Sequence, residues 1–175
     1  SVKVPFIASW PGHFAKGAVC SELFSHYDIL PTLCHLAGCP VNTKQEIPGH
    51  SFARWLEDPE LESSRPVVVF DEYGPVRMIR DKEWKLVLRY PYGPNEFYHL
   101  TEDPDETENL FHDPAQEDRI VAMRRQMEEW FLRYSDPDLD ARKEGVTGTG
   151  QYCRAGSRAH LLEKYGPMPR PVKNE

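Results

Sequence analysis

The residues best suited to chemistry lie around one turn, between two apolar runs of the sequence. Glu72 and Tyr73 follow the run VVVF at 67–70, and Arg77 follows Gly74-Pro75. A carboxylate and a phenol can hydrogen-bond the hydroxyl groups of a sugar or an aryl compound, and a guanidinium can bind an acidic group bidentately. Polar residues at a strand end project from a fixed scaffold. We therefore predict that Glu72, Tyr73 and Arg77 contribute to a substrate-binding rim. The alternative is that Glu72 and Arg77 pair with each other as structural residues.

Two other groups of polar residues are weaker candidates, in both cases as ligands of a metal ion. Asp28 and His35 lie seven residues apart on one face of a predicted helix, but no third ligand is evident, which favours roles in capping and packing. The acidic run at 103–108 lacks the glycine and the twelve-residue layout of a calcium loop, which favours an acidic turn. We predict no catalytic residue and no metal site in this chain.

The rim residues belong to a stretch, residues 65–100, whose pattern predicts a small antiparallel sheet. A β-branched and aromatic run at 67–70 is opened by a proline, as expected of a buried strand. Alternating side chains predict two further strands on either side of a polar reversal at 81–83, and a last strand follows a turn at 92–95. This meander of three or four strands has one apolar face, which needs a cover in water.

A helix predicted over 114–134 supplies that cover. Asp113 is a suitable N-cap, Pro114 suits the first helical position, and acidic residues near the start match the helix dipole. The apolar residues recur mostly at steps of three and four and draw one stripe, which is predicted to face the sheet. They are Ile120, Met123, Met127, Trp130, Phe131 and Tyr134.

The first 64 residues have the pattern of an α/β fragment. An apolar run at 4–8 is typical of a strand buried on both faces, and residues 18–24 are a second, shorter candidate. One helix is predicted over 25–38, with Ser25 as its cap, and a short one within 49–58. The first strand needs neighbours that residues 1–64 barely contain, so we expect most of its sheet to be missing from this sequence.

Three parts are therefore expected. Residues 1–64 form the end of an α/β domain, residues 65–135 form an α+β subdomain in which the small antiparallel sheet packs against the long C-terminal helix, and residues 136–175 form an irregular tail. The proportions of 39% hydrophobic and 28% charged residues are typical of a globular protein. A formal charge of -7 argues against a nucleic-acid partner. No apolar run approaches the ~20 residues of a membrane span. The sequence shows no signal peptide, and its four cysteines do not settle the compartment.

Five segments, in this order, resemble the C-terminal part of a type I sulfatase of the alkaline-phosphatase-like superfamily. They are VPFIASWPG, SHYDILPTLCHLAG, GHSFARWLED, VRMIRDKEWKLV and EFYHLTEDPDETENL, and the resemblance as a whole covers about residues 2–135. Lys3 and His99 depart from the residues usual in the family. The resemblance implies that the intact protein hydrolyses sulfate esters, of a sulfated carbohydrate or an aryl sulfate, with a formylglycine nucleophile beside a calcium ion.

The parts that perform this reaction in the family are not visible in the sequence. No Cys/Ser-x-Pro-x-Arg run is present, and there is no Asp-Asp pair, Asp-Asn-Gly or Asp-His-Gly. The resemblance thus implies a chain that is inactive alone, has no cofactor of its own, and completes a missing N-terminal sulfatase domain by supplying the cleft wall and specificity. Two alternatives stay open: a noncatalytic module that binds a partner or carbohydrate, and a phosphonate or phosphodiester hydrolase of the same superfamily.

Overall fold

A computed structural model describes residues 4–42, 44, 46–71, 76–90 and 93–135 of the chain. The chain forms two compact units, Ser1–Val67 and Val68–Glu175. The irregular tail predicted over 136–175 lies outside the described residues. None of the described helices is long and apolar enough to cross a membrane.

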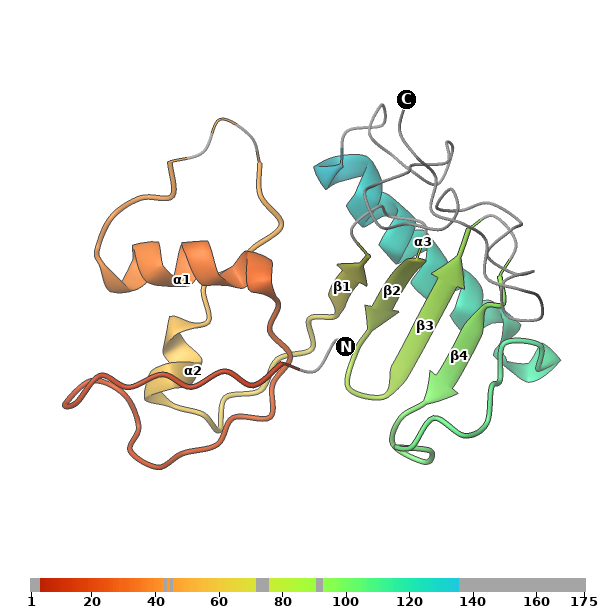
Figure 1. The fold of residues 1–175 in the computed structure, drawn as a ribbon, viewed down its shortest axis with the longest axis horizontal. Helices are drawn as coiled ribbons and strands as arrows, with labels where there is room; N and C mark the ends of the chain where they lie inside the picture. Colours follow the sequence, from red (N-terminus) through yellow and green to blue (C-terminus); the bar gives the residue numbers. More distant parts are fainter. Residues whose placement is uncertain (1–3, 43, 45, 72–75, 91–92, 136–175) are drawn as a thin grey trace, which may run out of the picture. The chain divides into compact units, whose positions relative to one another are not determined.

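The second unit is built on an antiparallel sheet of four strands (Figure 1). The strands follow one another in chain order across the sheet as β1 (Val67–Phe70), β2 (Val76–Arg80), β3 (Trp84–Arg89) and β4 (Glu96–His99). In the register, Arg77 of β2 lies opposite Leu88 of β3, and Leu86 lies opposite Phe97 of β4. The meander predicted from the alternation of side chains is confirmed, with four strands.

Helix α3 (Glu117–Tyr134) lies across one face of this sheet (Figure 1). A short 3₁₀ helix, η2 (Pro114–Gln116), leads into it, and the Asp113 side chain accepts a hydrogen bond of 2.9 Å from the Ala115 amide. Each large apolar side chain buried between the two layers stabilises the unit by about 1.5–3 kcal/mol. The buried core consists of Val68, Ile79, Trp84, Leu86, Leu88, Phe97, Met123, Met127 and Phe131. The predicted fold class, a small antiparallel sheet packed against a long C-terminal helix, is confirmed.

Among the described residues that precede β1, the first unit contains two helices and no strand. They are α1 (Ile29–Leu36), preceded by the 3₁₀ turn η1 (His26–Asp28), and α2 (Ala53–Glu57). These elements lie where the sequence predicts helices.

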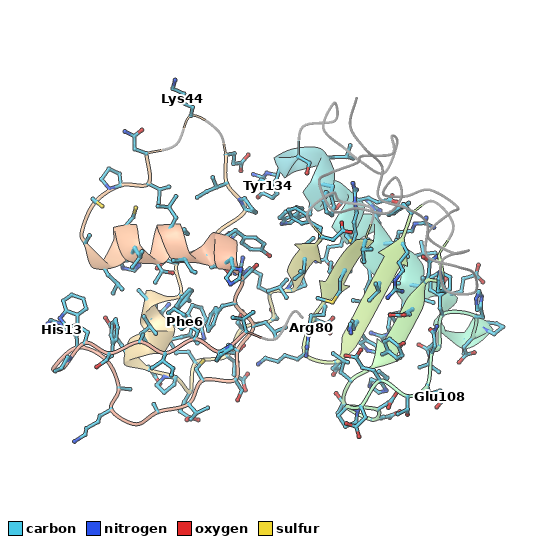
Figure 2. All side chains as sticks on the ribbon, in the orientation of Figure 1. Phe6, His13, Lys44, Arg80, Glu108 and Tyr134 are labelled. Atoms are coloured by element: carbon cyan, nitrogen blue, oxygen red, sulfur yellow. The ribbon has the colours of Figure 1, made fainter. Side chains whose placement is uncertain are left out.

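The strand expected at residues 4–8 is not formed. The segment is irregular, and Ile7 is 92% exposed. Phe6, labelled in Figure 2, contacts the ring of Phe52 with centroids 5.5 Å apart, yet stays 59% exposed. The second candidate, at 18–24, is irregular as well. A strand forms only where a neighbour completes its hydrogen-bond ladder, and no described residue that precedes β1 is in a strand.

Candidate functional site

The predicted rim lies at the connection between β1 and β2. Asp71 closes this hairpin twice: its amide donates to the Val76 carbonyl at 3.1 Å, and its Oδ1 accepts from the Val76 amide at 3.3 Å. Both ends of the connection are therefore held by the sheet. Glu72 and Tyr73 lie inside it and outside the described residues.

Arg77 is held in the core of the second unit. It is 2% exposed, and its Cζ lies 3.7 Å from the ring centroid of Phe131 and 5.5 Å from that of Tyr90. A guanidinium over an aromatic face is stabilised by the ring quadrupole, by about 2 kcal/mol when both groups are desolvated. In the described chain, aromatic rings thus cover a group that the sequence places at a substrate rim. The rim of Glu72, Tyr73 and Arg77 stays a prediction.

Arg77 and Ile79 are two residues apart in β2 and therefore share one side of the sheet. It is the side covered by α3, where Ile79 is part of the core and Arg77 meets Phe131. Charged residues are almost never fully buried without a partner group, so an arginine in a strand suggests the solvent face. No local signal in the sequence indicates the two aromatic residues, Tyr90 and Phe131, that the fold brings to the Arg77 guanidinium.

In the first unit, the Asp28 side chain carries a set of hydrogen bonds. Its carboxylate is fully buried and accepts hydrogen bonds from the amides of Ser25 and His50, each at 2.8 Å. Arg65 adds a charge-assisted bond of 2.6 Å. The Ser25 contact is the capping interaction that the Ser-x-x-Asp spacing predicts. The other two partners are 22 and 37 residues away in sequence, so no local pattern could reveal them.

A second set of contacts fastens residues 49–52 along α1. Thr32 Oγ1 accepts from the Phe52 amide at 2.9 Å, and His35 Nδ1 lies 2.9 Å from Ser51 Oγ. Gly49 permits the close approach, because a Cβ at this position would lie 1.9 Å from the Tyr27 carbonyl oxygen. We call these contacts, together with those of Asp28, the Asp28 hub.

The Asp28 hub has the chemistry of a structural clamp. The guanidinium of Arg65 carries only donors, so His50 Nδ1, 2.9 Å from Arg65 NH1, is an acceptor, and the neutral ring of His50 carries its proton on Nε2. Both carboxylate oxygens of Asp28 are engaged by donors. Asp28 and His35 therefore serve hydrogen bonds within the unit, as the sequence favoured.

The acidic run at 103–108 forms a turn closed by its own side chains. The Asp103 carboxylate accepts from the Thr107 amide at 3.0 Å, from the Glu108 amide at 2.8 Å and from Thr107 Oγ1 at 2.9 Å. These donors favour the charged form, so the two backbone amides first, and then the hydroxyl, lower the pKa of Asp103. Glu106 pairs with Lys85 of β3, which ties the turn to the sheet.

The described residues do not fit the cofactors that the family resemblance implies. No group of three or more His, Cys, Asp or Glu side chains among them is arranged to hold a metal ion. The carboxylates with the best geometry, Asp28 and Asp103, already accept hydrogen bonds on their oxygens. The whole sequence also lacks the run from which a formylglycine is made. No catalytic step is assigned to this chain.

Comparison with known proteins identifies the family. The fold and the sequence are those of the C-terminal part of a sulfatase of the alkaline-phosphatase-like superfamily, as the sequence predicted. The chain belongs to the family described as N-sulphoglucosamine sulphohydrolase, C-terminal, whose model matches residues 1–132.

Two named sulfatases that are similar in sequence support the family assignment. The chain is 25% identical over 212 aligned residues to an ulvan-active sulfatase of Formosa agariphila, an alignment that covers 99% of the chain and 41% of the relative. It is 31% identical over 142 residues to a Delta 4,5-hexuronate-2-O-sulfatase of Bacteroides thetaiotaomicron, covering 76% of the chain and 29% of the relative. The chain thus spans well under half the length of these two relatives.

A solved structure shows the same fold. A protein whose structure was solved in complex with its substrate D-glucosamine-2-N,6-O-disulfate superimposes with a TM-score of 0.59 at 22% identity. The superposition covers 75% of this chain and 28% of that protein. At this identity the likeness establishes the fold and nothing about the substrate of the present chain.

Proposed function

We propose that this chain is the C-terminal portion of a longer sulfatase that hydrolyses sulfate esters of carbohydrates. The observation that carries the proposal is the family match over residues 1–132. The carbohydrate class is supported by the names of the two curated relatives, one active on ulvan and one on a hexuronate 2-O-sulfate. The nucleophile and metal ligands would come from polypeptide outside this sequence.

In this proposal the second unit contributes the substrate rim. The connection between β1 and β2 is anchored by Asp71 at a sheet edge, so Glu72 and Tyr73 would project from a rigid base. Their carboxylate and phenol suit the hydroxyl groups of a sugar. Arg77 lies in β2, the strand that follows this connection, and its guanidinium packs on the ring of Phe131. In the proposal it would contribute to the rim from this position.

The first experiment separates the chain from the longer protein. The complete protein and the 175-residue chain are each purified and assayed on a sulfated disaccharide and on a small aryl sulfate, with and without calcium. We expect calcium-dependent turnover by the complete protein and none by the chain alone. Turnover by the purified chain above a mock preparation would refute its inactivity. Cleavage of phosphodiesters but not sulfate esters by the complete protein would favour the other hydrolase class.

A second experiment tests the rim through Glu72→Ala in the complete protein. A contact that positions the sugar, and does not break the bond, should lower kcat/KM for the carbohydrate and spare the small aryl sulfate. Glu60→Ala, which removes the same charge from an exposed position, is the matched control. Equal losses on both substrates with an unchanged folded fraction would rule out a specificity role for Glu72.

A further inference from the structure

The C-terminal end of α1 is a tight turn with a cysteine at each side. Gly38 follows the C-cap and adopts a φ of 66°, in the left-handed region that favours glycine. The Gly38 amide donates to the His35 carbonyl at 3.1 Å, and the Cys39 amide donates to the Cys34 carbonyl at 3.0 Å. These two bonds define a Schellman motif, which frequently brings the side chains of its first and last residues into contact. In this chain those residues are Cys34 and Cys39.

The two thiols are neighbours across this turn. Cys39 Sγ lies 3.6 Å from the Cys34 carbonyl oxygen, so the Cys39 side chain points back to the end of the helix. Burial first, and then a hydrogen bond and the charge of the Cys39 thiol, raise the pKa of Cys34. Such effects of one side chain on another act over only a few ångströms. Both cysteines are free thiols in the structure, with Cys39 exposed and Cys34 half-buried.

The backbone of this turn suits a disulfide bond. A disulfide requires Cα atoms that are about 4.4–6.8 Å apart and Cβ atoms that face each other. The hydrogen bond from the Cys39 amide to the Cys34 carbonyl joins two atoms that are one and two covalent bonds from these Cα atoms, so it holds the Cα atoms close together. The ordering that bond formation requires is therefore already present in the folded chain.

We propose that Cys34 and Cys39 are a redox-sensitive dithiol, which a low-molecular-weight disulfide such as glutathione disulfide oxidises to an intramolecular disulfide. This modification site goes beyond the proposed function and does not depend on it, because it needs only these two side chains and the turn that holds them. The bond would fasten the C-terminal end of α1 to the residue that follows its glycine cap.

The oxidation consists of two thiol–disulfide exchanges. Cys39 is exposed, and the raised pKa of Cys34 keeps that second thiol protonated, so the Cys39 thiolate attacks first. Its sulfur forms a mixed disulfide with one half of the reagent and expels the other half as a thiolate. The Cys34 thiolate then attacks the Cys39 sulfur, closes the intramolecular bond and expels the second half. The protein loses two protons and two electrons, and the reagent gains them and leaves as two thiols.

The test uses the reduced 175-residue chain, equilibrated with glutathione disulfide and glutathione at several ratios, quenched with acid and alkylated. Intact mass spectrometry should show a species that has lost the mass of two hydrogen atoms and two of its four alkylatable thiols. Peptide mapping should place the new bond between Cys34 and Cys39. In urea, where the turn no longer holds the thiols together, the equilibrium constant for oxidation should be roughly tenfold lower.

Substitutions of single cysteines test the assignment of the two sulfurs. Cys39→Ser should abolish the intramolecular bond, and Cys34→Ser should instead accumulate the mixed disulfide on Cys39. The matched control combines Cys20→Ser with Cys153→Ser, which leaves only the proposed pair and should oxidise like the unsubstituted chain.

Three results would overturn the proposal. The first is a pair that stays unbridged even in glutathione disulfide alone. The second is a bond that maps to Cys20 or to Cys153, which lies outside the described residues. The third is equal oxidation of the folded and the urea-unfolded chain, which would mean that the turn does not position the thiols. None of these readouts uses sulfatase activity, so a failure of this proposal is distinct from a failure of the proposed function.

Discussion

Replacing Asp28 by alanine should destabilise the first unit more than any other single polar substitution within it. The carboxylate is fully buried and accepts from the amides of Ser25 and His50 and from the Arg65 guanidinium. Alanine would leave two amides and a cation without their acceptor. Removing one partner of a buried ion pair typically costs 3–5 kcal/mol. The Arg65 side chain is 29% exposed and can recover hydration, so we expect the lower end, about 3 kcal/mol.

Hydrogen exchange measured by mass spectrometry reports this loss segment by segment. A destabilisation of about 3 kcal/mol should raise exchange at the amides of α1 and of residues 49–52 by roughly 100-fold, because each 1.4 kcal/mol is a factor of ten. Asp58→Ala is the matched control: Asp58 is exposed, and the hydrogen bond given for its carboxylate is a long one of 3.2 Å from the Glu60 amide.

Asp28→Asn removes the negative charge of the side chain and keeps its shape. An asparagine can still accept from the His50 amide, but its NH₂ group would face the donors of Ser25 and Arg65, so it should rescue little of the loss. The reasoning fails if Asp28→Ala raises exchange in α1 by less than about threefold. It also fails if the amides of β3 and α3 lose as much protection as those of α1.

Three further predictions concern both units. Residues 4–8 should be weakly protected from hydrogen exchange while β3 and α3 are strongly protected, and equal protection would mean that the first segment has found a partner strand. Phe131→Ala should cost about 3–5 kcal/mol in urea unfolding, with Leu132→Ala within about 0.5 kcal/mol as its neighbouring control. The lowered pKa of Asp103 means that its contribution to stability is present above the pKa it has in the unfolded chain and is lost as the pH falls through its lower folded value. Asp103→Asn should therefore make the urea midpoint less dependent on pH in the acidic range, and an unchanged slope would contradict this.

Patterns that are local in the sequence predicted the elements of the second unit. The β-branched run at 67–70 and the alternation around Leu86 predicted strands, and the apolar steps of three and four predicted α3 and its buried face. Asp113 and Ser25 likewise predicted helix starts as capping residues. These predictions succeed because the period of the apolar residues and the capping groups are determined within a few neighbouring residues. The family resemblance, drawn from five ordered segments, was confirmed by the family match over residues 1–132.

Contacts between residues that are distant in sequence could be seen only in the tertiary structure. Arg77 carries the alternation of a strand residue, and nothing near it indicates the ring of Phe131 that receives it. Arg65 and Asp28 form an ion pair across 37 residues. Glu72 and Tyr73 remain candidates known from the sequence alone.

The first unit shows most clearly the difference between what the local sequence determines and what the tertiary structure decides. The apolar run at 4–8 has the composition of a buried strand, and α1 has the composition of a helix with an apolar face. The run at 4–8 nevertheless forms no strand, and α1 exposes Leu30 and Leu33. Local sequence specifies which residues are suited to burial, whereas burial itself requires a surface that arrives from elsewhere in the polypeptide. Within α1, Pro31 and Thr32 are buried, and Thr32 hydrogen-bonds the Asp28 carbonyl and the Phe52 amide.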